Sequence, residues 1–158
     1  MPEQPSLFSM PQRTLTSDDY YTPKWVFDSL GVMFDLDVSS PPGGPPFVPC
    51  RRYYTQVDDG LSSPWDGLIW MNPPYSKPSP WVERFLNHDN GIALLPFAKS
   101  KWNQRLWDSD AQVIYLYAVK FEHSSPTNSG AAPFPLGLWA AGDNAKEILH
   151  NSNLGRVR

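Results

Sequence analysis

Residues 67–86 read GLIWMNPPYSKPSPWVERFL, and the order of apolar, proline and polar residues in this stretch indicates the class of fold. A short apolar run leads directly into Asn72-Pro73-Pro74-Tyr75, as is typical of a buried strand that ends in a loop of fixed shape. A helix is expected next, with Ser79 as its N-cap and Pro80 at its first position. The stretch therefore predicts a strand, a loop and a helix, in that order.

The same alternation of strands and helices extends in both directions. Upstream, Thr22 as N-cap, Pro23 at the first helical position and Gly31 at the end predict a short helix. Further strands are expected at 32–40, 51–56, 91–96, 111–121 and 133–141, and further helices at 100–107 and 143–151. The strands at 111–121 and 133–141 could pair as a hairpin across the loop 124–133. The pattern predicts an α/β fold whose sheet is mostly parallel, with an antiparallel C-terminal hairpin at one edge.

Length and composition indicate a globular chain. The 158 residues suggest one domain, 16–158, which follows a flexible lead-in over residues 1–15. The single cysteine cannot form an intramolecular disulfide, which favours a reducing, cytoplasmic location. No apolar run approaches the roughly 20 residues needed to span a membrane, and the N-terminus lacks the pattern of a signal peptide. The three histidines show no metal-site spacing with Cys50, so no metal site is expected.

The charges are distributed unevenly along the chain. The net charge is −3, yet residues 14–69 hold eight aspartates against three basic residues, whereas residues 77–105 hold five basic residues against two acids. The basic segment follows the NPPY loop directly, so Lys77, Lys99, Lys101 and Arg105 are candidate phosphate contacts. The alternative is that these side chains form an ordinary solvated surface.

Two polar side chains stand at strand ends. Asp37 closes the strand within 32–40, and Asn72 closes the strand before NPPY. Because ligands of parallel sheets bind outside the carboxyl ends of the strands, both residues are expected at one rim of the sheet. The Asn72 oxygen and the Pro73 carbonyl could each accept one N–H group of a planar amino group, and Pro74 would help to hold that carbonyl in place. Tyr75 offers a ring on which a base could stack. Such a site catalyses by positioning and electrostatics, without a metal or a covalent nucleophile.

These pieces together resemble a known family. The segments YYTPKWVFDSL, FDLDV, YYTQVDDGLSSPW, MNPPYSKPSPWVE, GIALLP and APFPLGLW occur in the order seen in the phage-type DNA adenine methyltransferases, the Dam-like family. The resemblance implies a Rossmann-like fold that uses S-adenosylmethionine to methylate the N6 amino group of adenine in DNA. It places Asn72, Pro73, Pro74 and Tyr75 in the catalytic loop. It assigns cofactor binding to five residues: Tyr21, Thr22, Pro23, Asp37 and Asp59.

The sequence is also compatible with two other functions. A protein glutamine methyltransferase would need the same acceptor geometry, and NPPY is found in such enzymes too. A non-catalytic cofactor-binding module or proline-rich adaptor would use NPPY as an exposed ligand. Asp59 could also be a plain turn residue. The short chain leaves recognition of DNA to loops, chiefly 76–80, 98–107 and 122–134.

Overall fold

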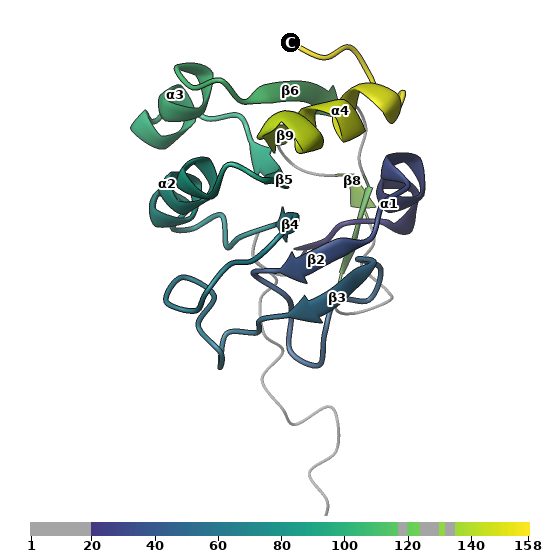
Figure 1. Ribbon diagram of the computed structural model, residues 1–158, viewed down its shortest axis with the longest axis vertical. Helices are drawn as coiled ribbons and strands as arrows, with labels where there is room; N and C mark the ends of the chain where they lie inside the picture. Colours follow the sequence, from purple (N-terminus) through teal and green to yellow (C-terminus); the bar gives the residue numbers. More distant parts are fainter. Residues whose placement is uncertain (1–19, 117–119, 124–129, 132–134) are drawn as a thin grey trace, which may run out of the picture.

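A six-stranded sheet between two helical layers organises the computed structural model, which describes residues 20–116, 120–123, 130–131 and 135–158 (Figure 1). The strand order is β3-β2-β4-β5-β9-β6. The strands are β2 (Phe34–Asp37), β3 (Cys50–Tyr53), β4 (Ile69–Met71), β5 (Gly91–Pro96), β6 (Gln112–Leu116) and β9 (Leu136–Ala141). The lead-in expected at 1–15 lies outside the described residues.

The pairing agrees with the predicted fold class. β3, β2, β4 and β5 are mutually parallel, whereas β9 is antiparallel to both β5 and β6. The expected pairing of the last two strands is confirmed, and β9 lies inside the sheet while β6 forms its edge. All six residues of β5 and of β9 are buried, because both faces of the sheet are covered there.

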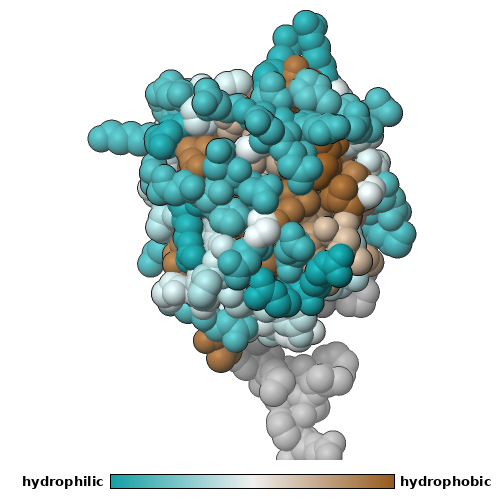
Figure 2. All heavy atoms as spheres, viewed as in Figure 1, coloured by the Kyte–Doolittle hydropathy of each residue, from teal (hydrophilic) through white to brown (hydrophobic). Residues whose placement is uncertain are grey.

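The helices cover opposite faces of the sheet (Figure 1). α1 (Lys24–Leu30) and α4 (Asp143–Asn151) pack with Phe34, Trp70 and Leu94 in one apolar cluster. α2 (Ser79–His88) and α3 (Lys101–Trp107) pack with Leu36 and Trp139 in the other. Hydrophilic residues cover most of the face seen in Figure 2, so the two apolar clusters lie mainly inside.

The starts of two helices need correction. α1 begins one residue later than predicted: Pro23 is its N-cap and the Thr22 hydroxyl does not cap it, because Thr22 is buried and receives a hydrogen bond from Asn72. α2 has Pro78 rather than Ser79 as N-cap, which places Pro80 at the second helical position. Gly31 ends α1 in the left-handed conformation, as predicted.

The prediction of one long strand over residues 111–121 is also wrong. β6 ends at Leu116, and β7 (Lys120–His123) belongs to a separate three-stranded sheet with β1 (Tyr20–Tyr21) and β8 (Gly130–Ala131). β7 pairs antiparallel with β1, about a hundred residues earlier in the chain. Local periodicity cannot reveal such a non-local partner, so the sequence predicts one strand where the structure has two.

Candidate active site

Asp37 and Asn72 lie at the same rim of the sheet. β2 and β4 are adjacent and parallel, and Asp37 pairs in register with Trp70, two residues before Asn72. The Val38 amide donates to the Trp70 carbonyl at 3.1 Å, so the two strand ends stay joined beyond the end of β2. The strand ends expected to meet at one rim therefore do so.

Asp37 is a buried carboxyl group. Its side chain is only 2% exposed, and its Oδ1 accepts the Ser39 amide at 3.0 Å. Burial raises the pKa of Asp37 from 3.8 to about 7, and the hydrogen bond from Ser39 acts in the opposite direction. A buried carboxyl that is this costly to ionise is suited to a cationic ligand, which would favour the charged form.

Ser39 adds a second polar atom at this strand end. Its hydroxyl oxygen is buried and has no hydrogen-bond partner among the described residues. Buried polar atoms are normally paired, so an unpaired one beside Asp37 fits a site that receives a polar ligand. Both groups fit the ammonium and carboxylate end of an amino-acid-bearing cofactor.

The NPPY loop is tied to the segment before α1. Asn72 Nδ2 donates to Thr22 Oγ1 at 3.2 Å, although fifty residues separate the two in sequence. With its nitrogen directed to Thr22, the amide turns its oxygen, the acceptor that the proposed chemistry needs, away from Thr22. Thr22 and Pro23 are both buried, so this contact brings the predicted cofactor segment and the predicted catalytic loop together.

The rest of the loop is held by packing. Pro73 is buried and Pro74 is exposed. The half-buried Tyr75 packs against both apolar clusters, and its hydroxyl donates to the Leu94 carbonyl at 2.9 Å. Burial raises the pKa of Tyr75 well above its usual value, so its hydroxyl stays a donor. A loop anchored in this way is not the exposed, extended ligand that an adaptor would need.

Asp59 lies in a turn beyond β3. It has a φ of +55°, accepts a hydrogen bond from the Ser62 hydroxyl at 2.5 Å, and is exposed. Its carbonyl also accepts the amides of Ser62 and Ser63. These contacts agree with the turn alternative, and a cofactor role for Asp59 stays a prediction.

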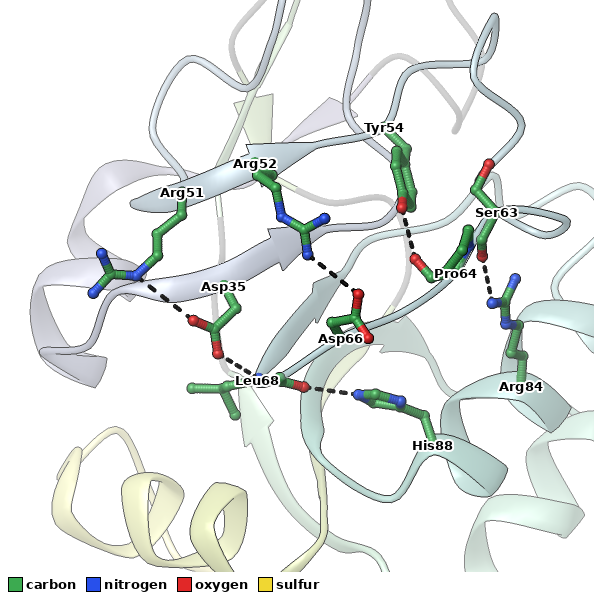
Figure 3. A network of polar contacts seen from close by, with 11 residues as sticks. Asp35, Arg51, Arg52, Tyr54, Ser63, Pro64, Asp66, Leu68, Arg84 and His88 are labelled. Atoms are coloured by element: carbon green, nitrogen blue, oxygen red, sulfur yellow. Dashed lines mark hydrogen bonds and ion pairs between the residues drawn. The ribbon is translucent and has the colours of Figure 1, made fainter.

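Sequence reasoning overlooked Arg84, which holds this turn from α2. Its guanidinium donates to the carbonyls of Gly60, Leu61 and Ser63 and lies 4.5 Å from the centre of the Trp65 ring. Figure 3 shows Arg84 reaching Ser63 beside the Tyr54–Pro64 hydrogen bond. Three carbonyl acceptors from one turn are a tertiary feature, and nothing in the local sequence around Arg84 signals them.

Gly60 allows the same turn to pack closely against the rim. A Cβ atom at this position would lie 2.0 Å from the Val38 carbonyl oxygen, immediately after Asp37. Only glycine therefore allows the turn to lie against the end of β2. Figure 3 also shows the ion pairs of Arg51 with Asp35 and of Arg52 with Asp66, which connect β3 to its neighbour β2 and to the segment that precedes β4.

The four candidate phosphate contacts are all exposed: Lys77, Lys99, Lys101 and Arg105. Lys77 follows the NPPY loop, while Lys99 and Lys101 follow the end of β5 at the same rim. Arg105 forms an ion pair with Glu83 of α2 at 3.2 Å, which competes with a role in binding phosphate. Their contact with DNA stays a prediction.

No group of three histidine, cysteine, aspartate or glutamate side chains within the described ranges lies close enough to hold a metal ion. No helix in the described part of the chain is long and apolar enough to cross a membrane.

Comparison with known proteins points to one family. The family described as DNA N-6-adenine-methyltransferase (Dam) matches residues 11–131. The DNA N-6-adenine-methyltransferase of Haemophilus phage HP1 (strain HP1c1) is 27% identical over 110 residues, covering 63% of this chain and 62% of that protein. The DNA N-6-adenine-methyltransferase of Escherichia phage T1 is 32% identical over 76 residues, covering 44% of this chain and 32% of that protein. The chain thus spans less than two thirds of either relative, and no solved structure matches it.

Proposed function

We propose that this chain, which belongs to the family of DNA N-6-adenine-methyltransferases, transfers a methyl group from S-adenosylmethionine to the N6 amino group of adenine in DNA. The observation that carries the proposal is the shared rim of Asp37 and Asn72, with Asn72 hydrogen-bonded to Thr22. In this proposal the end of β2 binds the methyl donor, and the end of the neighbouring β4 binds the amino group of the target base. We further propose that the reaction takes place in the cytoplasm.

Asp37, Ser39, Thr22 and Pro23 would hold the donor, with Tyr21 adjoining them. S-adenosylmethionine supplies an electrophilic methyl group on a positively charged sulfur. The buried Asp37 carboxylate would face the ammonium group, and the Ser39 hydroxyl would gain a polar partner.

Asn72 and Pro73 would bind the amino group of the target base. The Asn72 oxygen and the Pro73 carbonyl each accept one N–H bond, which favours a tetrahedral nitrogen whose lone pair can attack the methyl group. The sulfur keeps the electron pair of the broken bond, and the proton displaced from nitrogen passes to solvent. Tyr75, placed by its hydrogen bond to Leu94, would line the base pocket with its ring, and Pro74 would hold the loop in shape.

A labelling experiment tests this function. The protein is incubated with radiolabelled S-adenosylmethionine and a mixture of DNA, RNA and protein, and the DNA is digested to nucleosides for mass spectrometry. N6-methyladenine that appears with the native chain and not with Asn72→Ala supports the proposal. Methylcytosine as the main product, or label only on protein glutamine, would refute it.

A further inference from the structure

A groove on the α3 side of the sheet has aromatic and cationic walls. It measures about 380 Å³ and is lined by Phe97, Trp107, Val113, Tyr115, Arg156 and Arg158. None of the predicted catalytic or cofactor residues belongs to it. No acidic side chain is among the lining residues.

Three aromatic rings in the groove are nearly parallel. The Phe97 ring makes an angle of 24° with Trp107 and of 16° with Tyr115, with centroids 6.0 Å and 5.7 Å apart. Trp107 is 49% exposed and Tyr115 is 50% exposed, which is unusual for such large rings. Gly137 of β9 makes this arrangement possible, because a Cβ atom there would lie 2.8 Å from the Phe97 ring.

The two arginines are placed by backbone pairing. Arg158 exchanges hydrogen bonds with Val113 at 2.9 and 3.1 Å, and Val157 forms a bridge to Ile114, so residues 157–158 run along the edge strand β6. Alternate residues of an extended segment lie on the same face, which puts Arg156 and Arg158 on one side and Val157 on the other. Within the described residues, neither guanidinium has an ion pair or a hydrogen bond.

From these features we infer that the groove binds an unpaired stretch of DNA, whose bases stack on Trp107 and Tyr115 while Arg156 and Arg158 contact the phosphates. Exposed aromatic faces beside cationic side chains are the chemistry by which proteins hold single strands without reading their sequence. An apolar protein surface is less suited to the groove, because it would cover two guanidinium groups without supplying a negative charge, which the phosphates of DNA supply.

The groove lies within reach of the candidate active site. Met71 of β4 pairs in register with Ala93 of β5, so the NPPY loop that follows Met71 begins beside the next residues of β5. Leu95 of β5 pairs with Gly137 of β9, which in turn pairs with Tyr115 of β6. Tyr115 is therefore level with the NPPY loop along the strand direction. β4 and β6 are three strand steps apart, or about 14 Å. This inference rests on the proposed function only for the choice of DNA over RNA.

An adenine-free oligonucleotide separates the groove from the active site. Binding of fluorescein-labelled oligothymidylate of 16 nucleotides is measured by anisotropy, so failure of adenine methylation and failure of groove binding are read independently. Trp107→Ala should weaken binding about tenfold, the typical effect of removing one stacking ring. Trp25→Ala is the matched control, since Trp25 is 44% exposed on α1, and it should leave the affinity unchanged.

A second variant avoids any loss of core packing. Arg156→Gln/Arg158→Gln should reduce the salt dependence of binding, with a log–log slope about 1.4 less steep because two phosphate contacts are lost. Arg51→Gln/Arg52→Gln on the opposite edge strand, β3, is the matched control and should keep the native slope.

Several results would overturn the inference. They are unchanged affinity in both groove variants, equal weakening in the controls, or tighter binding of oligouridylate than of oligothymidylate. A native dimer in sedimentation velocity that Trp107→Ala dissociates would assign the groove to a second copy of the chain instead.

Discussion

Replacing Asp37 by Asn should make the ligand-free protein more stable at pH 8 and less able to bind its cofactor. Burial raises the pKa of Asp37 from 3.8 to about 7, so the ligand-free protein holds this carboxyl protonated far more readily than the unfolded chain does. An asparagine side chain resembles the protonated carboxyl in shape, and its oxygen can still accept the Ser39 amide.

The size of the effect follows from the pKa. A rise from 3.8 to about 7 corresponds to about 4 kcal/mol at 1.36 kcal/mol per unit. Because the folded pKa lies above the unfolded one, this contribution to stability is fully present below pH 3.8 and is lost as the pH rises to about 7. Asp37→Asn removes that loss, so its free energy of unfolding should exceed that of the native protein at pH 8 by up to about 4 kcal/mol.

Urea unfolding at pH 5 and pH 8 measures this difference. The advantage of Asp37→Asn over the native protein should grow from pH 5 to pH 8, since the other titrating groups are common to both proteins. Asp110→Asn, which changes an exposed aspartate, is the control and should follow the native protein at both pH values. An advantage that is absent at pH 8, or equal at the two pH values, would refute the argument.

The same substitution should have the opposite effect on ligand binding. Loss of one charge-assisted contact typically weakens binding by more than tenfold. In calorimetry with S-adenosylmethionine, the native protein should also release a proton on binding near pH 6, because the ligand's ammonium favours the charged carboxylate. If Asp37→Asn bound S-adenosylmethionine as well as the native protein did, Asp37 would have no contact with the cofactor.

Four further substitutions test the rim and the turn that Arg84 holds. Asn72→Ala should abolish methyl transfer while calorimetry shows S-adenosylmethionine bound with little change, and residual activity within a few fold of native would exclude Asn72 as the acceptor. Tyr75→Phe keeps the aromatic ring and should keep most activity, but its free energy of unfolding should fall by about 1 kcal/mol because the hydrogen bond to the Leu94 carbonyl is lost. Tyr75→Ala should lose activity as well, because it also removes the ring. Equal inactivity of both Tyr75 variants would instead assign the hydroxyl a catalytic role. Arg84→Gln should cost about 1.5–3 kcal/mol in urea unfolding, because it removes a charged donor from three carbonyls; a cost below 0.5 kcal/mol would show that the turn is held otherwise.

Arg84 and Gly60 show where reading the sequence alone falls short. Arg84 ties the turn after β3 to α2, and Gly60 lets the same turn lie against the end of β2, through contacts that link residues more than twenty positions apart. Neither residue stands in a motif that signals such a contact. The same holds for Thr22, expected to cap a helix and found instead to receive a hydrogen bond from Asn72.

The amino-acid sequence by itself determined the α/β class, the strand ends at Asp37 and Asn72, and the order of the segments that resemble the family. These features are local, because apolar runs, prolines and glycines fix strands and turns through nearby residues. Only the tertiary structure decided the burial of Asp37, the contact between Asn72 and Thr22, the division of residues 111–121 between two sheets, and the groove beside β6. Each of these depends on which distant segments pair or pack, and the free energy of that choice is distributed over the whole fold rather than over neighbouring residues.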